Sequence, residues 1–461
     1  MQESAIQEVR EPERRVPVRA TVDVLVVGGG PAGLMAALAA SEEERASVAL
    51  VEQRSFVGGN LTIGLPVLGF LSQKGTPIIA GLPQRFIDRL AAIGGASPHR
   101  PCPLHVSLTL IEPEAVKTVG LEMLREGGVN VMLYSLFSAP VVENGAVRGV
   151  IVEGKAGREA ILAKVVIDCT GDADVAFRAG VPCGKGNEQG GMQPPTLMFC
   201  LAGVDTEKLR LSIASERGNY TADFIPNEYF GRNRQFIVVG LRRQIEQAKA
   251  EGLSIPTERT IIITGLKEGE AWINMTRVKG VDGTDPRSLS SGEMEARSQI
   301  GDIVKYLTRY VPGFENCRLT KTAPFLGIRE TRRVVGRYEL TREDILACRR
   351  FEDAIAVASY PIDLHRPNDE GCTLEWCGDC YDIPYRCLLP VGIENLLVAG
   401  RCISTTHEAM AATRVMATCM ALGEAAGRAA GIAVRQGAPP SRIDAGKLQK
   451  ELLAKGAYLR V

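Results

Sequence analysis

The sequence has no excess of charge of either sign. Lys plus Arg and Asp plus Glu both number 54, so the formal net charge at pH 7 is +0. A protein that binds nucleic acid or an anionic membrane normally carries a surplus of Lys and Arg, which neutralises phosphate groups. The balance therefore excludes nucleic acid as an expected partner and favours small molecules.

Long hydrophobic runs are also absent. The longest apolar stretches are interrupted by Gly, Arg or Glu well short of the roughly 20 residues that cross a bilayer. Residues 1–19 form a charged segment without the apolar core of a signal peptide. We therefore expect a cytoplasmic protein with no membrane partner.

The chain is too long for one compact core. Its 461 residues predict two structural regions and room for a large cofactor. Val22 to Val27 is a β-branched run of strand length that stops at three glycines, and the Ala-rich segment from Pro31 is typical of a helix. Val48 to Val51 returns to strand, so the chain opens with a βαβ unit of a doubly wound α/β domain.

A glycine fingerprint lies between the first strand and the helix. Gly28, Gly30 and Gly33 have the spacing G-x-G-x-x-G, and the acidic Glu52 follows Gly33 by nineteen positions at the end of the second strand. Glycines here permit a tight turn and let the backbone approach a pyrophosphate, while the helix N-terminus offers amide donors to the phosphate. The sequence therefore predicts dinucleotide binding, and we extend the predicted site to the neighbouring residues Pro31, Ala32, Gln53 and Arg54.

Further along, the pattern predicts a Rossmann-like domain with a parallel sheet and a β-meander, plus an inserted mixed α+β domain. A helix is expected over 113–125, and an Asn-Gly turn at 144–145 joins meander strands over 139–143 and 146–153, with a third strand over 159–166. A strand at 395–399 and a long helix over 411–433 complete the first domain. The expected division is a leader at 1–20, a first part of the cofactor domain at 21–195, an inserted substrate domain at 196–365, a second cofactor part at 366–440 and a tail at 441–461.

Five separated segments identify the cofactor more closely. Together they resemble the FAD-dependent oxidoreductase family that is related to the fumarate reductase and succinate dehydrogenase flavoproteins. The segments are Gly58-Gly59-Asn60-Leu-Thr-Ile-Gly64, Ile167-Asp-Cys-Thr-Gly-Asp172, Gly327-Ile-Arg-Glu-Thr-Arg-Arg333, Tyr360-Pro-Ile-Asp-Leu-His365, and Asn395-Leu-Leu-Val-Ala-Gly-Arg401 through Arg414. The resemblance implies FAD as the cofactor.

The resemblance also implies roles for further residues. Gly59 and Asn60 would lie along the pyrophosphate and ribityl chain, Thr170, Gly171 and Asp172 would border the dinucleotide, and Phe137 would lie near the adenine. Gly400 and Arg401 would lie beside the ribityl chain, although many fumarate reductase relatives have Glu in place of Arg401. The helix start at Ala411, Ala412 and Thr413 would face the pyrimidine end of the flavin, where its dipole can stabilise negative charge.

Four residues are candidates for the chemistry. Only four histidines occur. His365 and His407 fall in the family-like segments and are expected to donate or take the proton that accompanies hydride transfer, or to be structural. His99 and His105 lie in a Pro-rich loop, where a solvated position is expected. Arg329 and Arg414 are candidates for binding a substrate carboxylate or phosphate; a salt-bridge cluster is the alternative for the run 329–333.

The cysteines are crowded in one segment. Cys372, Cys377, Cys380 and Cys387 lie within sixteen residues, which is compatible with unliganded thiols, a metal or iron-sulfur site, or a redox disulfide. Buried unliganded thiols are the default, so no metal ligand is assigned.

The expected function is that of an FAD-dependent oxidoreductase, transferring a hydride between flavin and a small organic substrate, including one that carries a carboxylate. The alternative is a binding or assembly subunit with a structural FAD. A second nucleotide fingerprint for NAD(P)H is not visible, and the electron partner and the direction of transfer stay open. We also include a homo-oligomer as a predicted assembly of the chain.

Overall fold

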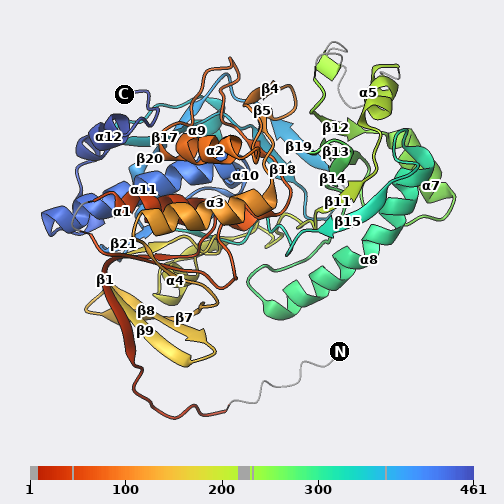
Figure 1. The fold of residues 1–461 in the computed structure, drawn as a ribbon. Helices are drawn as coiled ribbons and strands as arrows, with labels where there is room; N and C mark the ends of the chain where they lie inside the picture. Colours follow the sequence, from red (N-terminus) through yellow and green to blue (C-terminus); the bar gives the residue numbers. More distant parts are fainter. Residues whose placement is uncertain (1–8, 44–45, 216–228, 231–232, 369–370) are drawn as a thin grey trace.

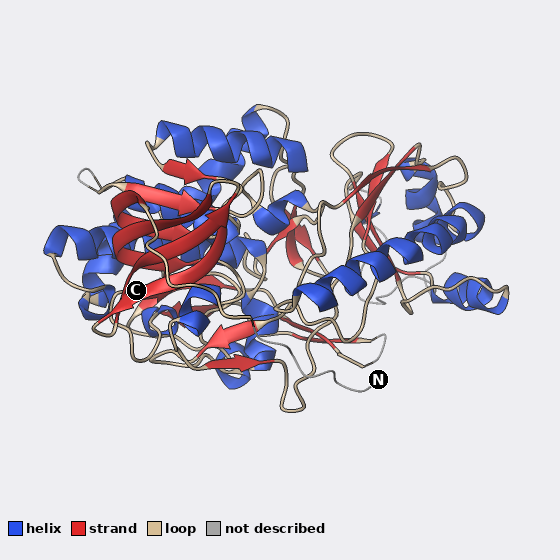
Figure 2. Ribbon diagram, turned by 90° about the horizontal axis from the view of Figure 1, so that it is seen from below, coloured by secondary structure: helices blue, strands red, loops and turns tan. Residues whose placement is uncertain are grey.

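The computed structural model describes residues 9–43, 46–215, 229–230, 233–368 and 371–461. The described chain builds two hydrophobic cores, each around its own sheet. Figures 1 and 2 show the larger region with its sheet and covering helices on one side, and the smaller region with the long helix α8 (Pro286–Tyr310) on the other. The predicted α/β fold with an additional domain is therefore confirmed.

The larger region is organised by a seven-stranded sheet of order β6-β2-β1-β9-β8-β7, with β21 beside β9. The central strands are parallel because helices connect them, and they are buried on both faces. The strands are β1 (Val18–Val27), β2 (Val48–Val51), β6 (Asn130–Met132), β7 (Leu136–Glu143), β8 (Ala146–Gly154), β9 (Gly157–Asp168) and β21 (Leu396–Val398). The meander is antiparallel, and the predicted Asn144-Gly145 turn joins β7 to β8.

Two helices lie back to back in this region through small side chains. They are α1 (Pro31–Ser41) and α11 (Met416–Gln436). A Cβ atom on Gly423 would lie 2.0 Å from the Ala32 carbonyl oxygen, and one on Gly427 would lie 2.3 Å from the Ala36 carbonyl oxygen. The absence of side chains at these two glycines lets the helix backbones approach closely, which brings the start of α11 next to the glycine turn.

The long helix predicted over 411–433 is two helices. α10 (His407–Thr413) ends at Arg414, and α11 begins at Met416. Val415 between them has extended backbone angles (φ −67°, ψ 148°), which cannot continue a helix. The expected helix start at 411 is therefore wrong, because residues 411–413 lie inside α10, and the two helices begin at His407 and Met416.

The remaining elements of the larger region cover its sheet and edges. They are η1 (Gly59–Thr62), β3 (Val67–Leu68), α2 (Leu82–Ala92), β4 (Arg100–Cys102), β5 (Val106–Thr109), α3 (Pro113–Glu126), α4 (Asp174–Arg178), β10 (Cys183–Lys185), β16 (Arg332–Val334), α9 (Arg342–Leu346), β17 (Ala354–Ala358), β18 (Ile362–His365), β19 (Cys372–Glu375), β20 (Tyr381–Pro384), η3 (Tyr385–Leu388), η4 (Pro440–Arg442) and α12 (Ala445–Ala454).

The smaller region contains a five-stranded antiparallel sheet of order β12-β13-β14-β11-β15. Its elements are β11 (Phe199–Ala202), α5 (Thr206–Ser215), β12 (Ile237–Gly240), α7 (Arg242–Ala250), β13 (Thr260–Thr264), β14 (Glu270–Ile273), α8 and β15 (Arg318–Thr322). Its core contains residues from Leu197 to Leu326, together with Ile63 and residues between Cys102 and Leu110, whereas Val334 to Ile362 pack into the first core. The division at 365 stays a proposal, and the packing favours an earlier return to the larger region.

Within the described residues, none of the helices combines the length and apolar character that crossing a bilayer requires.

Candidate functional site

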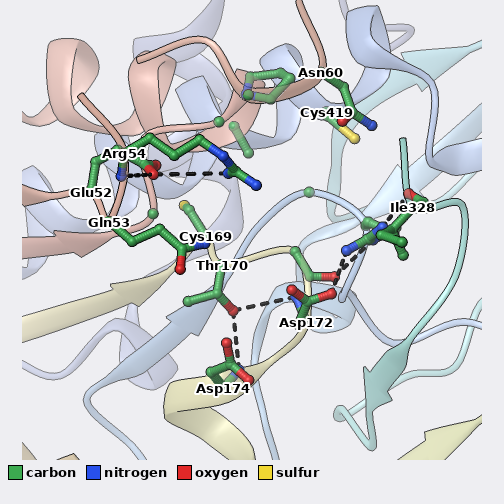
Figure 3. Close-up of a pocket in the computed structure, with 18 of the residues that line it drawn as sticks. Glu52, Gln53, Arg54, Asn60, Cys169, Thr170, Asp172, Asp174, Ile328 and Cys419 are labelled. Carbon is green, nitrogen blue, oxygen red and sulfur yellow. Dashed lines mark hydrogen bonds and ion pairs between the residues drawn. The ribbon is translucent and has the colours of Figure 1, made fainter. Parts of the chain in front are cut away.

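A cavity of about 230 Å³ opens where four parallel strands end. Its floor is formed by residues that directly follow β1, β2, β9 and β21, and its far wall by residues 325–329, which lead out of the smaller region. The carboxyl edge of a parallel sheet is where α/β proteins bind nucleotides, because loops and helix N-termini converge there. Figure 3 shows side chains from these separated segments converging on the cavity.

Most of the residues that we predicted for the cofactor line this cavity. They are Gly28, Gly30, Pro31, Ala32, Glu52, Gln53, Arg54, Gly59, Asn60, Phe137, Thr170, Gly171, Asp172, Gly400 and Arg401. Arg329 and Arg414 line it too. The predicted residues outside its lining are Gly33, Ala411, Ala412, Thr413, His365 and His407. The roles of all these residues remain predictions.

The glycine turn forms a cradle with one open side. A Cβ atom on Gly28 would lie 2.5 Å from the Cys169 carbonyl oxygen, and one on Gly33 only 1.7 Å from the Gly28 carbonyl oxygen. A Cβ on Gly30, by contrast, meets nothing within 4 Å. Gly28 and Gly33 are thus required by protein packing, while Gly30 leaves space at the N-terminus of α1. A pyrophosphate fits such a cradle, because it needs close backbone approach and amide donors.

Glu52 holds the turn together from the end of β2. Its buried carboxylate accepts hydrogen bonds from the Gly29 amide (2.7 Å, Oε2) and the Arg54 amide (2.9 Å, Oε1). The guanidinium of Arg54 lies over the Phe325 ring, 3.6 Å from its centroid. Arg54 and Phe325 therefore join the two regions across the cavity.

The end of β9 is shaped by a buried carboxylate. Asp168 accepts hydrogen bonds from the Thr170 hydroxyl (2.7 Å), the Thr170 amide (3.1 Å) and the Ala176 amide (3.0 Å). Burial raises the pKa of Asp168 to about 6 despite these donors. The bonds fix the loop that presents Thr170 to the cavity.

Arg401 is engaged by protein groups. Its Nε donates to the Gly171 carbonyl (2.9 Å), and its other nitrogens bond to the Ile328 carbonyl and to Asp172. Asp172 is also bonded by the Thr331 hydroxyl at 2.7 Å. Arg401 therefore bridges the loop after β9 to the far wall, and it contributes part of the cavity lining in doing so.

The helix that reaches the cavity is α11. Met416 and Cys419 in its first turn line the cavity, whereas the expected residues of α10 do not. The prediction missed this because residues 411–422 contain neither proline nor glycine, so no helix breaker in the sequence marks Val415.

One end of the cavity is strongly cationic. Arg329 and Arg414 line it, and behind them Asp363 on β18 faces Arg414 (3.5 Å, Nη2 to Oδ2) and His365 (3.5 Å, Nε2 to Oδ1). Burial alone would raise the pKa of Asp363, but the adjacent His365 and Arg414 hold it well below its usual range. Burial, together with the Arg414 and Arg277 cations, lowers the pKa of Arg329 to about 9.

His365 has both ring nitrogens engaged. Nδ1 lies 3.2 Å from an Arg277 nitrogen and Nε2 faces Asp363. Burial and the Arg329 and Arg414 cations lower the pKa of His365 to about 4, with Asp363 opposing them, so the ring is neutral at pH 7. Because the Arg277 guanidinium can only donate, Nδ1 accepts and Nε2 carries the hydrogen.

His407 belongs to a second buried network. Its Nδ1 lies 2.7 Å from Glu330 Oε1, and the same oxygen accepts from Arg333 at 2.6 Å. Gln193 connects the networks of the two histidines. Its backbone amide donates to Glu330, and its side-chain oxygen accepts from the backbone amide of His365.

The arginines of the run 329–333 include examples of both predicted alternatives, the salt-bridge cluster and the cavity residue. Arg332 pairs with Asp174 (2.9 Å) and Arg333 with Glu330, so these two form salt bridges. Among the described groups, the guanidinium of Arg329 has one hydrogen-bond partner, the Pro194 carbonyl. Only Arg329 of this run reaches the cavity.

His99 and His105 were expected to be solvated, but both pack against other side chains. His99 lies 2.6 Å from the Thr109 hydroxyl and 2.9 Å from Gln84 Oε1, and it stacks on Phe70. His105 is half-buried and stacks on Tyr360. The Pro-rich loop folds back as strands β4 and β5, which a local composition argument could not predict.

The four crowded cysteines do not converge. Cys387 is fully buried in the core, Cys380 contacts Arg460 (3.4 Å), Cys377 contacts Gln73 (3.4 Å) and Cys372 contacts Arg259 (3.8 Å). Over the described part of the chain, no three His, Cys, Asp or Glu side chains are grouped to hold a metal ion.

Asp363, Phe325, Met416 and Cys419 are among the site residues that sequence reasoning missed. Asp363 stood inside a family-like segment, two residues before His365, and a charged residue in an otherwise apolar strand was a usable signal. Phe325 and Met416 carried no signal, since they reach the cavity only through the packing of distant segments.

A protein-family comparison agrees with this geometry. The family model described as FAD dependent oxidoreductase matches residues 23–452.

Two curated proteins match part of the chain. Digeranylgeranylglycerophospholipid reductase of Methanoculleus marisnigri is 31% identical over 176 residues, which cover 34% of this chain and 41% of the relative. Thiamine thiazole synthase of Aeropyrum pernix is 31% identical over 137 residues, covering 28% of this chain and 43% of the relative. The chain thus matches less than half the length of these relatives.

Solved structures align more extensively at low identity. A geranylgeranyl bacteriochlorophyll reductase-like protein of Thermoplasma acidophilum has a TM-score of 0.45 and 15% identity, over 95% of this chain and 84% of that one. A p-nitrophenol 4-monooxygenase of Pseudomonas putida DLL-E4 has a TM-score of 0.49 and 15% identity, over 94% and 84%.

Proposed function

Because the chain belongs to the FAD-dependent oxidoreductase family, and is therefore an enzyme with FAD as its cofactor, we propose that it transfers a hydride between FAD and a small organic substrate that carries a carboxylate. When bound, FAD supplies the hydride acceptor or donor. The protein supplies binding, orientation and control of charge.

The cavity residues divide the work of holding the cofactor. The open side of Gly30 and the amides at the start of α1 would receive the pyrophosphate. Glu52, at the end of β2, would accept from a ribose hydroxyl in addition to its two amide donors. The start of α11, at Met416, would direct its positive end toward the flavin ring.

The observation that carries the substrate proposal is the pair Arg329 and Arg414. Both guanidinium groups line the same cavity, and Asp363 is the carboxylate that faces Arg414. The lowered pKa of Arg329 means that its positive charge is poorly stabilised where it lies. A carboxylate bound between the two arginines would relieve this repulsion and would be fixed in orientation by charge-assisted hydrogen bonds.

Proton transfer at this site would not reach a histidine directly from the cavity, because Arg414 and Asp363 lie between the cavity and His365. His365 lies behind Asp363, and both of its nitrogens are engaged. His365 remains our candidate for the proton-transfer network, with Asp363 as the group between it and the cavity lining.

We also infer that the likeness to the fumarate reductase and succinate dehydrogenase flavoproteins reflects shared cofactor-holding segments. The support is that residues from four of those segments, among them Asn60, Asp172, Arg329 and Arg401, line one cavity.

The test is reoxidation of the photoreduced enzyme without oxygen. A panel of unsaturated carboxylic acids is compared with the matching esters, and the reverse reaction is followed as bleaching by saturated or hydroxylated acids. We expect the acids to react faster than the esters. Equal rates for acids and esters would contradict the carboxylate proposal, and no reaction with any organic compound would contradict the hydride proposal.

Two variants sharpen this test. Arg329→Gln should raise the concentration of acid needed for half-maximal rate by at least about tenfold, since it removes about 1.4 kcal/mol or more of binding. Arg337→Gln is the control, because Arg337 is exposed outside the cavity lining and its guanidinium donates to the Ser441 carbonyl at 2.9 Å. Its half-maximal concentration should equal that of the wild type.

A further inference from the structure

The turn after helix α9 lies against the segment between β19 and β20, away from the residues that the proposed reaction uses. Cys348 is in this turn and Cys377 is in the segment. We propose that Cys348 and Cys377 are an oxidative modification site, a thiol pair that a hydroperoxide converts into a disulfide.

A backbone hydrogen bond and a thiol–thiol hydrogen bond place the two cysteines side by side. The Gly378 amide donates to Cys348 Sγ at 3.1 Å, and Gly378 directly follows Cys377. Burial and the adjacent Cys348 thiol, which hydrogen bonds with it, raise the pKa of Cys377 to about 12. Gln73 donates to Cys377 Sγ at 3.4 Å and to the Cys377 carbonyl at 2.7 Å, and these bonds fix the position of Cys377.

The two thiols differ in the way that a two-step oxidation requires. Cys348 is half-buried and therefore reachable, and the Gly378 amide donates a hydrogen bond to its sulfur. Cys377 is 4% exposed and stays a thiol. Cys348 is the group that meets the oxidant, and Cys377 is the resolving group beside it.

The chemistry balances with the hydroperoxide as the only added reactant. The Cys348 thiolate attacks one peroxide oxygen, the O–O bond breaks, and the other oxygen leaves as an alcohol or water after taking up a proton. Cys348 is then a sulfenic acid. The Cys377 sulfur attacks the Cys348 sulfur, the S–S bond forms, the S–O bond breaks, and the oxygen leaves as water with the proton of the Cys377 thiol.

The neighbouring cysteines are less suited to this reaction. Cys380 is only 5% exposed, and its sulfur is already engaged by Arg460 at 3.4 Å, which in turn pairs with Asp382. Cys387 has no exposed surface. Crowding in the sequence favoured pairs within 372–387, whereas the fold supplies the partner from residue 348.

Oxidation would tie together the two ends of one segment. Residues 349–376 contain β17, β18 and β19, and β18 carries Asp363 and His365. A disulfide between 348 and 377 therefore closes a loop around the strand that faces Arg414. Loop closure restricts the unfolded chain, so the oxidised protein should melt at a higher temperature than the reduced protein.

The experiment treats the reduced, FAD-loaded full-length protein with hydrogen peroxide. We expect loss of two titratable thiols, a mass decrease equal to two hydrogen atoms, and a peptide map that joins residues 348 and 377. The melting temperature should rise by a few degrees and return after reduction with a dithiol.

Variants separate this pair from general cysteine oxidation. Cys348→Ser should prevent both the thiol loss and the melting shift, while Cys377→Ser should leave Cys348 overoxidised to sulfinic acid. Cys317→Ser is the matched control, because Cys317 is half-buried in the smaller region; this variant should behave as the wild type. Three results would each overturn the proposal. They are a peptide map that joins residues 377 and 380, sulfinic acid at Cys348 in the wild type, and unchanged thiol loss in Cys348→Ser.

Discussion

Arg414 is held at the cavity by Asp363, which offers it two acceptors. Arg414 Nη2 lies 3.1 Å from the Asp363 carbonyl oxygen and 3.5 Å from its Oδ2. The same carboxylate faces His365 on its other oxygen and accepts from the Tyr360 hydroxyl at 3.3 Å. One half-buried charge thus organises the cation that lines the cavity and the histidine behind it.

Asp363→Asn should therefore weaken substrate binding without loss of FAD. The amide keeps the shape but loses the charge that positions Arg414, and we expect KM for the acid substrate to rise about tenfold, equivalent to about 1.4 kcal/mol. Steady-state kinetics and the flavin-to-protein ratio check this. Asp353→Asn is the control, since Asp353 pairs with the exposed Arg386 at 2.9 Å. An unchanged KM would show that Asp363 only supports the fold.

His365→Ala and His407→Ala should each lower kcat while FAD stays bound. His365 contacts Asp363 and Arg277, and His407 contacts Glu330, so removal of either ring disturbs a buried charge network beside the cavity. The measurement is turnover with the substrate found by reoxidation screening, at matched flavin content. Wild-type turnover in both variants would show that other groups transfer the proton.

Gly30→Val should abolish FAD retention and leave the fold intact. The Gly30 backbone has φ −70°, which valine accepts, and its Cβ would enter open space in the cavity. The side chain would then occupy the position proposed for the pyrophosphate. The flavin-to-protein ratio and the circular dichroism spectrum of the variant check this. Gly301→Val is the control, because Gly301 on α8 also has open space around its Cβ. Full FAD occupancy in Gly30→Val would contradict the assigned phosphate position.

Gly423→Ala should destabilise the protein despite the better helix propensity of alanine. The added Cβ would lie 2.0 Å from the Ala32 carbonyl oxygen, which forces α1 and α11 apart. The cost of overpacking exceeds the gain in helix propensity, so we expect a net loss of about 2 kcal/mol in the free energy of unfolding. Urea unfolding measures it. The comparison is Gly301→Ala, which meets no atoms on α8 and should gain about 1 kcal/mol. Equal stability of the two variants would refute the close-packing account.

Glu424→Gln should stabilise the protein relative to the wild type, and this gain should be larger at high pH than at low pH. Burial raises the pKa of Glu424 from 4.5 to about 7, although the Leu82 amide donates to it at 3.1 Å. A raised folded-state pKa stabilises the protein fully below pH 4.5, and this contribution is lost as pH rises through 7. At pH 8 the wild type should therefore have lost about 3 kcal/mol, which the neutral amide does not lose.

Melting temperatures at pH 5 and pH 8 test the Glu424 prediction. Glu343→Gln is the control, since the Glu343 side chain is 76% exposed. A stability difference between wild type and Glu424→Gln that is the same at both pH values would count against a raised pKa.

The sequence by itself determined the nucleotide-binding frame. Strand β1, the turn at Gly28 and helix α1 follow from local chemistry, because a β-branched run, glycine conformations and helix-favouring residues each act within a few positions. The same holds for the Asn144-Gly145 turn, where a two-residue hairpin requires positive φ angles. Such features need no information about distant parts of the chain.

Only the tertiary structure decided which charged residues face the cavity. Arg329, Arg332 and Arg333 look alike in the sequence, but neighbours from other segments engage Arg332 and Arg333 in salt bridges and leave Arg329 in the cavity wall. The break at Val415 and the pairing of Asp363 with Arg414 depend likewise on packing between segments far apart in the chain. Long-range packing sets the positions of such side chains, and local propensity does not contain it.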